Sequence, residues 1–217
     1  MWCPILIICL FSLCAIRTYA EDGAAYPSPD GRFSISTASG STTNHHTIGL
    51  IDLSTRNILA SYDREVRAIT VLWSPDSQFV AINEDISHEC GHLSIWHLKD
   101  LKWEPVYLPQ TLRSLSVIDD PKTKTYHSEE VINRLLPKDE AKLIRFWWGS
   151  HDPTAVKWLN GSDLQIEVDG EGSMRNGCHM SAGFSFIIHC LSNCTAKVVE
   201  KKQLHLEITQ EQNPDSK

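Results

Sequence analysis

Apolar and polar residues alternate along several short segments of the chain, which is the pattern of half-buried β-strands. Residues 164–169 alternate strictly between the two classes, and residues 33–37 begin the same way, with Phe33 and Ile35 at the apolar positions. Residues 79–82 are apolar at every position, which predicts a strand that is buried on both faces. The hydrophobic pattern therefore predicts a mainly β protein.

Each of these segments is followed by two further segments of apolar and β-branched residues, with short polar turns between them. The additional predicted strands are residues 47–53 and 58–62, residues 93–98 and 106–108, and residues 184–190 and 196–200. The chain is thus expected to consist of units of about three or four consecutive antiparallel strands.

A short phrase introduces each unit. Pro27-Ser28-Pro29-Asp30-Gly31-Arg32-Phe33 recurs as Trp73-Ser74-Pro75-Asp76-Ser77-Gln78-Phe79, and a divergent third copy spans 158–164. Pro presets the first position of a turn, Asp caps the turn with its side chain, and Gly accepts a positive φ. The copies lie 46 and 85 positions apart. A period of about 40–50 residues with several strands per unit predicts a propeller-like array, although three units are fewer than the 4–8 blades of a closed propeller.

The Ser-Pro-Asp-Gly-x-Phe phrase, with a Trp three residues before the Asp, resembles the blades of WD-like propellers. It is similar in particular to the PD-repeat blades of bacterial periplasmic Tol-system proteins. The resemblance covers roughly residues 25–108 and 153–203 and implies a fold, while propellers host many functions. Ser77 and Ser162 replace the turn Gly, and Asn160-Gly161 replaces Pro-Asp in the third copy.

The first twenty residues are interpreted as a signal peptide. Residues 4–16 form an apolar run that is broken only by Ser12, and Thr18-Tyr19-Ala20 fits a small-residue cleavage site. The run is too short to span a membrane as a helix, and no later segment is long enough. We therefore expect an exported protein, periplasmic or extracellular, with one β domain over 21–207 and a flexible tail over 208–217.

Residues 110–150 interrupt the strand pattern. Ser128 precedes a helical spacing of apolar residues that ends at Pro137, and residues 138–145 predict a second helix, with Phe146-Trp147-Trp148 packing after it. We expect a helical insertion that covers a sheet face or edge. A degenerate fourth blade or a partner-binding cap is the alternative for this stretch.

Charge and motifs narrow the function classes. The net charge of −7 argues against nonspecific binding to nucleic acid or to anionic membranes. The sequence contains no nucleophile-elbow motif, no P-loop and no Rossmann glycines, so it predicts no cofactor. Oligomeric state is open.

Four of the seven cysteines lie beyond the predicted signal peptide. An even number of cysteines in an exported protein suggests disulfides, and four cysteines allow three connectivities. The candidates are Cys90, Cys178, Cys190 and Cys194. Cys190 and Cys194 flank a predicted hairpin turn, whereas Cys90 and Cys178 fall in equivalent predicted loops. Free, partly buried thiols are the alternative.

His88-Glu89-Cys90-Gly91-His92 matches the zinc-peptidase signature H-E-x-x-H. On a helix, His88 and His92 would share one face toward a zinc ion, and Glu89 would act as general base on the bound water. However, these residues fall between two predicted strands, and a helix there would disrupt the repeat. A third interpretation places several loop residues on one face as a transition-metal site: His45, His46, His88, Cys90, His92 and His179.

The sequence is therefore interpreted as an exported, propeller-like β domain that binds a protein or peptide partner and has no catalytic or metal site. The alternative function is a zinc-dependent hydrolase that uses His88, Glu89 and His92. The two interpretations predict different structures for residues 88–92: a helix for the zinc hydrolase, and a loop between strands for the propeller-like domain.

Overall fold

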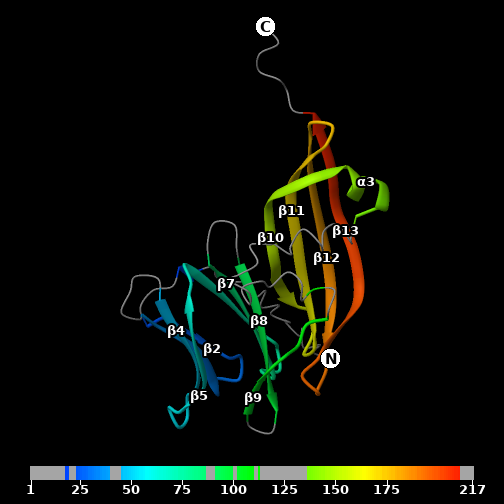
Figure 1. The fold of residues 1–217 in the computed structure, drawn as a ribbon. Coiled ribbons are helices and arrows are strands. Elements are labelled where there is room, and N and C mark those ends of the chain that lie inside the picture. Colours follow the sequence, from blue (N-terminus) through cyan, green and yellow to red (C-terminus); the bar gives the residue numbers. More distant parts are fainter. Residues whose placement is uncertain are drawn as a thin grey trace, which may run out of the picture.

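The computed structural model describes residues 18–19, 23–39, 45–86, 91–99, 102–109, 112 and 136–210. This part of the chain is mainly β and forms three antiparallel sheets in chain order, here called blade 1, blade 2 and blade 3 (Figure 1). Blade 1 contains β2 (Ala25–Pro27), β3 (Phe33–Ser39), β4 (His45–Asp52) and β5 (Ile58–Glu65). Blade 2 contains β6 (Ala68–Trp73), β7 (Phe79–Asp85), β8 (Gly91–Lys99) and β9 (Lys102–Pro105). Blade 3 contains β10 (Ile144–Trp158), β11 (Asp163–Met174), β12 (Cys178–Cys190) and β13 (Ala196–Gln210).

Within each blade, consecutive strands pair with each other, as the alternating pattern and short turns predict. Blade 2 has one additional strand, β1 (Thr18–Tyr19), which pairs with the free edge of β6 opposite Ala68 and Ile69. The two β1 residues belong to the stretch interpreted as a signal peptide. Removal of residues 1–20 would therefore remove β1 from the edge of blade 2. The strand pairings within the three blades would remain.

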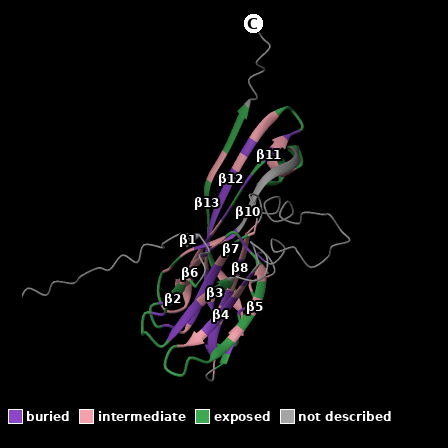
Figure 2. Ribbon diagram, turned by 90° about the vertical axis from the view of Figure 1, so that its left-hand side faces the viewer, coloured by how far each residue is buried: buried purple, intermediate pink, exposed green. Residues whose placement is uncertain are grey.

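β7 contributes to both hydrophobic cores of the described structure. Val80 and Ile82 pack toward blade 1, whereas Phe79 and Ala81 pack toward blade 3. All four side chains are buried, and in Figure 2 buried residues concentrate in the central strands of the blades. The prediction of a strand buried on both faces is confirmed. Blade 2 is the middle layer, with one core on each side.

The recurring turn phrase forms the same hydrogen bonds in blades 1 and 2. The Ser28 hydroxyl accepts from the Phe33 amide at 3.0 Å and donates to the Asp30 carboxylate at 2.7 Å. Ser74 and Asp76 make the equivalent bonds in blade 2. Because one hydroxyl serves both the strand amide and the turn carboxylate, the spacing of Ser, Asp and Phe in the repeat is set by this turn.

The departures from the repeat have physical reasons. Gly31 has a φ of 71°, and Ser77 occupies the same left-handed region with a φ of 59°. Backbone strain of this kind costs about 1 kcal/mol or more for a residue with a side chain. The fully buried Ser77 hydroxyl accepts a hydrogen bond from the Asp30 amide at 3.2 Å, which offsets part of that strain and links the two turns.

Gly161 replaces the repeat's Asp because the adjacent blade already occupies the space. A Cβ at this position would lie 2.5 Å from a carboxylate oxygen of Asp76. The third turn is closed instead by the side chain of Asn160, whose oxygen accepts from the amides of Ser162 and Asp163 at 2.8 Å each.

In blades 2 and 3, a tryptophan at the end of the strand that precedes the turn links the blade to the preceding one. The Trp73 indole donates to the carbonyl of Tyr26 in blade 1 at 3.0 Å, and the Trp158 indole donates to the carbonyl of Leu72 in blade 2 at 2.9 Å. Tyr26 and Leu72 occupy equivalent positions of the repeat. The Trp that recurs at this position in blades 2 and 3 therefore connects neighbouring blades, which the sequence pattern did not reveal.

The described parts of the 110–150 stretch cover the core face of blade 3. Leu112 and Leu136 are buried in the same core as blade 3, and Ala141 of α3 (Lys138–Leu143) packs against it. The second predicted helix is confirmed in shortened form, because β10 begins directly after Leu143 and includes residues 146–148. The first predicted helix lies outside the described residues, apart from Leu136.

Blade 3 is larger than expected and extends beyond the other two sheets in Figure 1. β12 begins at Cys178 rather than near 184, and β13 runs to Gln210, three residues into the stretch predicted to be a tail. Apart from Met180, residues 178–183 carry small or polar side chains, a composition that is typical of a loop. They form a strand because Met180 and Ala182 face the core, while Gly183 leaves room for the His205 ring on the opposite face.

Candidate functional site

The histidines that were expected in loops lie in strands where the structure describes them. His46 belongs to β4, His92 to β8 and His179 to β12. The prediction was wrong on this point because the antiparallel ladders continue further than the apolar pattern: Glu84 pairs with His92 at the end of β7 and β8. Among the described residues, no three His, Cys, Asp or Glu side chains converge on a place that would hold a metal ion.

The zinc-peptidase signature is described only at its end. Gly91 and His92 are the first two residues of β8 and pair with Asp85 and Glu84. The extended backbone at these positions differs from the helical backbone on which the signature's two histidines share a face. His88, Glu89 and Cys90 lie outside the described residues.

The three described cysteines are free thiols. A disulfide between Cys190 and Cys194, one of the pairings left open by the sequence, is not formed. The Cys194 thiol instead turns toward blade 2 and donates to the Glu104 carboxylate at 3.1 Å. Burial, together with this hydrogen bond, raises the pKa of Cys194. Burial also raises the pKa of the Cys190 thiol to about 12. Both thiols are therefore held in the unreactive protonated form.

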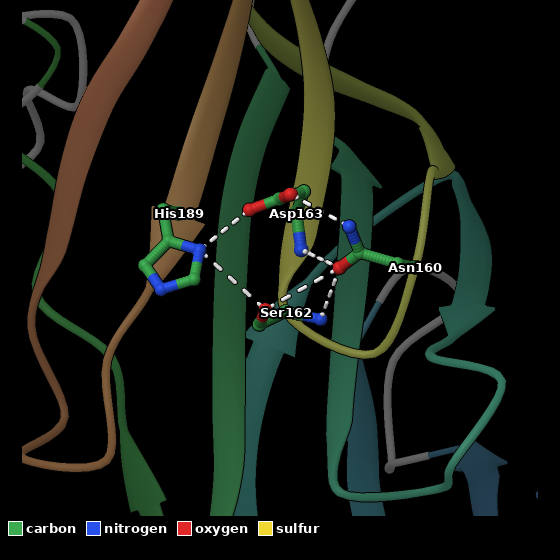
Figure 3. A network of polar contacts seen from close by, with 4 residues as sticks. All are labelled: Asn160, Ser162, Asp163 and His189. Carbon is green, nitrogen blue, oxygen red and sulfur yellow. Dashed lines mark hydrogen bonds and ion pairs between the residues drawn. The ribbon is translucent and has the colours of Figure 1, made fainter.

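A Ser, an Asp and a His meet at the divergent third turn (Figure 3). The His189 Nδ1 atom lies 2.5 Å from the Asp163 carboxylate and 3.4 Å from the Ser162 hydroxyl. The hydrogen bond from His189, followed by that from Asn160, lowers the pKa of Asp163. These two hydrogen bonds therefore favour the ionised form of the Asp163 carboxylate.

The same three residue types form a hydrolase triad when the acid and the serine contact opposite nitrogens of the imidazole. Here Asp163 and Ser162 both contact Nδ1, so the imidazole does not lie between them as a proton carrier. The arrangement instead ties the turn between β10 and β11 to β12. We interpret it as a structural element that replaces the Pro-Asp turn of the other two copies.

A polar cluster around a buried carboxylate lies between blade 1 and blade 2. The Glu84 side chain is fully buried and accepts hydrogen bonds from the Tyr62 hydroxyl at 2.6 Å and the Ser94 hydroxyl at 3.1 Å. The Arg64 Nε atom lies 3.1 Å from Glu84 Oε2 as an ion pair, although the two groups are not aligned as a hydrogen bond. We call Tyr62, Arg64, Glu84 and Ser94 the polar seam.

The surroundings of Tyr62 in the polar seam change the pKa of its hydroxyl. Burial raises the pKa of Tyr62 strongly, and the adjacent Glu84 charge raises it further. Tyr62 therefore remains a protonated donor to Glu84. Its ring also stacks on Trp96, with centroids 5.9 Å apart, so it connects the polar seam to an adjoining small apolar pocket.

Sequence reasoning missed the polar seam entirely. Glu84 falls in the polar run that follows the apolar residues 79–82, and that run was interpreted as a loop. The signal that would have found it is parity: residues 80, 82 and 84 share one face of an extended strand. A carboxylate on that face predicts a buried partner from the neighbouring blade.

No model of a known protein family matches the chain, and no curated protein matches it. Among solved structures, the crystal structure of TolB from Acinetobacter baumannii is similar, with a TM-score of 0.33 and 11% sequence identity. The match covers 88% of this chain and 47% of that chain, so the protein spans about half the length of TolB. No helix among the described residues is long and apolar enough to cross a membrane.

Proposed function

We propose that the protein is an exported, propeller-like domain that binds a protein or peptide partner and acts through binding rather than catalysis. The observation that carries the proposal is the outer edge of blade 3. β13 is 15 residues long. Its first residue, Ala196, donates its amide to the Tyr107 carbonyl at 3.0 Å, and beyond that residue β13 pairs, among the described residues, only with β12. Its second edge is therefore available to an extended segment of a partner, which is a common mode of peptide recognition.

Part of this edge is better suited to pairing than the rest. The register between β12 and β13 shifts twice, which leaves Val199 and Leu204 as extra residues in β13. Such bulges interrupt the edge and discourage unwanted pairing. The uninterrupted stretch 205–210 lies beyond the second bulge, and we assign the partner strand to it.

Exposed apolar side chains accompany the edge. Val199, Leu204 and Ile208 are 51%, 45% and 49% exposed. A partner strand would gain main-chain hydrogen bonds from β13, and pockets for its side chains against Leu204 and Ile208 would supply selectivity.

Export is supported by the apolar run over residues 4–16 and the small-residue site that ends at Ala20. Assignment of the repeats to the PD type is supported by the identical turn hydrogen bonds that Ser28 and Ser74 make. Both remain parts of the proposal.

The proposal is tested by selecting peptides from a display library against the purified protein. Selected peptides should slow hydrogen exchange at residues 205–210, and the double substitution Leu204→Lys and Ile208→Lys should weaken their binding at least about tenfold. Leu53→Lys, at an equally exposed apolar residue in the turn between β4 and β5, is the control and should bind as the wild type does. Protection confined to other strands would refute the assignment of this edge.

A further inference from the structure

Two turns of blade 3 carry the sequence of an acceptor site for sugar. Asn193-Cys194-Thr195, between β12 and β13, fits the N-glycosylation pattern Asn-x-Ser/Thr, and Asn160-Gly161-Ser162, between β10 and β11, fits it as well. Both asparagines are exposed. The surroundings of their side-chain amides differ, and this difference distinguishes the two acceptor sequences.

Asn193 lies at the tip of its turn. The Cys194 amide donates to the Leu191 carbonyl at 3.0 Å and closes a β-turn, of which Ser192 and Asn193 are the central residues. Cys194 follows with a φ of 60°, in the left-handed region, and its buried thiol donates to Glu104 of blade 2 at 3.1 Å. The middle residue of this acceptor sequence therefore anchors the turn to blade 2, while the asparagine before it stays exposed.

The side-chain oxygen of Asn193 faces back into the hairpin. It accepts hydrogen bonds from the Thr195 hydroxyl at 2.6 Å and from the Thr195 amide at 3.3 Å. The nitrogen Nδ2 projects from the same planar carbon in another direction, and no described residue forms a hydrogen bond with it. A glycosidic bond at Nδ2 of Asn193 would therefore leave both hydrogen bonds of Oδ1 in place.

Asn160 differs because its whole amide group is part of the fold. Its Oδ1 accepts from the amides of Ser162 and Asp163 at 2.8 Å each, and its Nδ2 donates to the Asp163 carboxylate at 2.6 Å. A sugar on Nδ2 would compete with that carboxylate for space. Reorienting the amide would break the bonds that close this turn, and Gly161 is already packed against Asp76 of blade 2. A glycan at Asn160 would therefore oppose the folding of blade 3.

We propose that Asn193 is an N-glycosylation site of the secreted protein, whereas Asn160 is a structural residue. The proposal rests on export, which is part of the proposed function, and specifies a secretory pathway that contains an oligosaccharyltransferase. The donor is an oligosaccharide linked through a diphosphate to a polyisoprenyl lipid. Nδ2 attacks the anomeric carbon of the first sugar, the bond from that carbon to the diphosphate oxygen breaks, and the lipid diphosphate leaves. Nδ2 loses one of its two protons to the transferase, so the product is a neutral glycosyl amide.

The glycan would lie at the opposite end of β13 from the segment to which we assign the partner strand. β13 begins at Ala196, just after Asn193, and residue 205 lies about 30 Å further along the extended strand. Figure 1 shows the start and the end of β13 at opposite ends of blade 3. The modification therefore shields the first part of the long edge and leaves residues 205–210 at the far end.

Secretion of the full chain from a eukaryotic cell line tests the site. Enzymatic removal of N-glycans in heavy-oxygen water converts a glycosylated Asn to a labelled Asp, which peptide mass spectrometry locates. In the secreted protein the occupancy at Asn193 should exceed that at Asn160 by about tenfold or more, because a bulky surface glycan suits only the first position. Thr195→Val should abolish the label at Asn193. Thr195→Ser, which keeps the acceptor sequence, is the matched control and should retain it.

A second chain, in which residues 1–20 are replaced by an established secretory signal, separates failure of the site from failure of export. If only this chain is glycosylated at Asn193, the native export signal fails and the site stands. The sugar is added before release, so the cell-associated pool of this chain is analysed together with the secreted pool. Absence of the glycan at Asn193 from both pools overturns the proposal, and so does equal occupancy of Asn160 and Asn193 in the secreted protein.

Discussion

The side chain of Asn83 pairs with the backbone of Ala155 as if it were an additional peptide group. Its Nδ2 donates to the Ala155 carbonyl and its Oδ1 accepts from the Ala155 amide, both at 2.8 Å. Asn83 belongs to β7 and Ala155 to β10, so this amide joins blade 2 to blade 3 through the donors and acceptors of a strand. Neither residue belongs to the recurring turn phrase.

Asn83→Ala should destabilise the protein by about 1–3 kcal/mol, because it leaves a partly buried amide and carbonyl of β10 without their partner. The free energy of unfolding from urea denaturation measures the loss. Asn57→Ala, in the exposed turn between β4 and β5, should stay within about 0.5 kcal/mol of the wild type. Equal effects at the two asparagines would contradict a specific role for the Asn83 pair.

Loss of the Trp73 hydrogen bond and loss of the Trp158 hydrogen bond should destabilise the protein to a similar extent. Trp73→Phe and Trp158→Phe each remove one hydrogen bond to the preceding blade, so each should cost about 1 kcal/mol from that bond plus a term for the lost ring volume. Thermal or urea unfolding of the two variants, side by side, provides the comparison. If only one of them is destabilised, the contacts are not equivalent elements of the repeat.

Gly161→Ala should destabilise the protein even though Ala is otherwise a favourable residue. Its Cβ would lie 2.5 Å from Asp76, whose carboxylate is already held by the Ser74 hydroxyl at 2.6 Å. We expect a loss of about 1–3 kcal/mol. In an Asp76→Ala background the same substitution should cost much less, which a double-mutant cycle measures. An unchanged cost in that background would show that the clash lies elsewhere.

Asp163 should contribute to stability in a pH-dependent way. Because His189 and Asn160 lower its folded pKa below 3.8, its contribution is complete above the unfolded pKa and is lost as the pH falls through the folded pKa. Urea unfolding between pH 6 and pH 2 should therefore show a shallower acid decline in Asp163→Asn. His189→Gln should reproduce much of that change, and a decline as steep as in the wild type in both variants would argue against the pair.

The described thiols should differ in reactivity. Cys178 is half-buried, whereas Cys190 is buried, with a pKa raised to about 12. Iodoacetamide at pH 8 should therefore label Cys178 well before Cys190, with mass spectrometry of timed samples as the readout. Rapid labelling of Cys190 in the folded protein would contradict its burial. Whether Cys90 forms a disulfide stays a prediction, and the same experiment without reductant addresses it.

The regular part of the fold could be predicted from the sequence because it depends on local patterns. The recurring Ser-Pro-Asp turn located the strands at Phe33 and Phe79, and the apolar run 79–82 identified the strand shared by two cores. The ends of the strands were harder to predict from the sequence. His92 is the second residue of β8 and Cys178 is the first residue of β12, yet both were interpreted as loop residues. They lie in strands because pairing with a neighbouring strand supplies the stabilisation that their own side chains do not.

The candidate sites depend on contacts between distant residues and were largely missed. Glu84 meets Tyr62 and Arg64 only because two blades stack. The local pattern places Glu84 on a buried face but does not identify these two residues of the other blade as its partners. Conversely, the zinc signature and the cysteine spacing are local patterns whose chemistry requires a particular backbone. Gly91 and His92 lie in a strand, whereas the zinc signature requires a helix. Cys190 and Cys194 are free thiols, although their spacing in the sequence suggested a disulfide.

The double burial of β7 has a consequence for how the molecule comes apart. Loss of blade 1 uncovers Val80 and Ile82, whereas loss of blade 3 uncovers Phe79 and Ala81, so neither outer sheet can detach without exposing apolar surface on the middle one. In a stacked array the stability of each layer includes its interfaces with its neighbours. The middle sheet should therefore be the last to lose its protected amides, and single-blade fragments should not persist as folded species in solution.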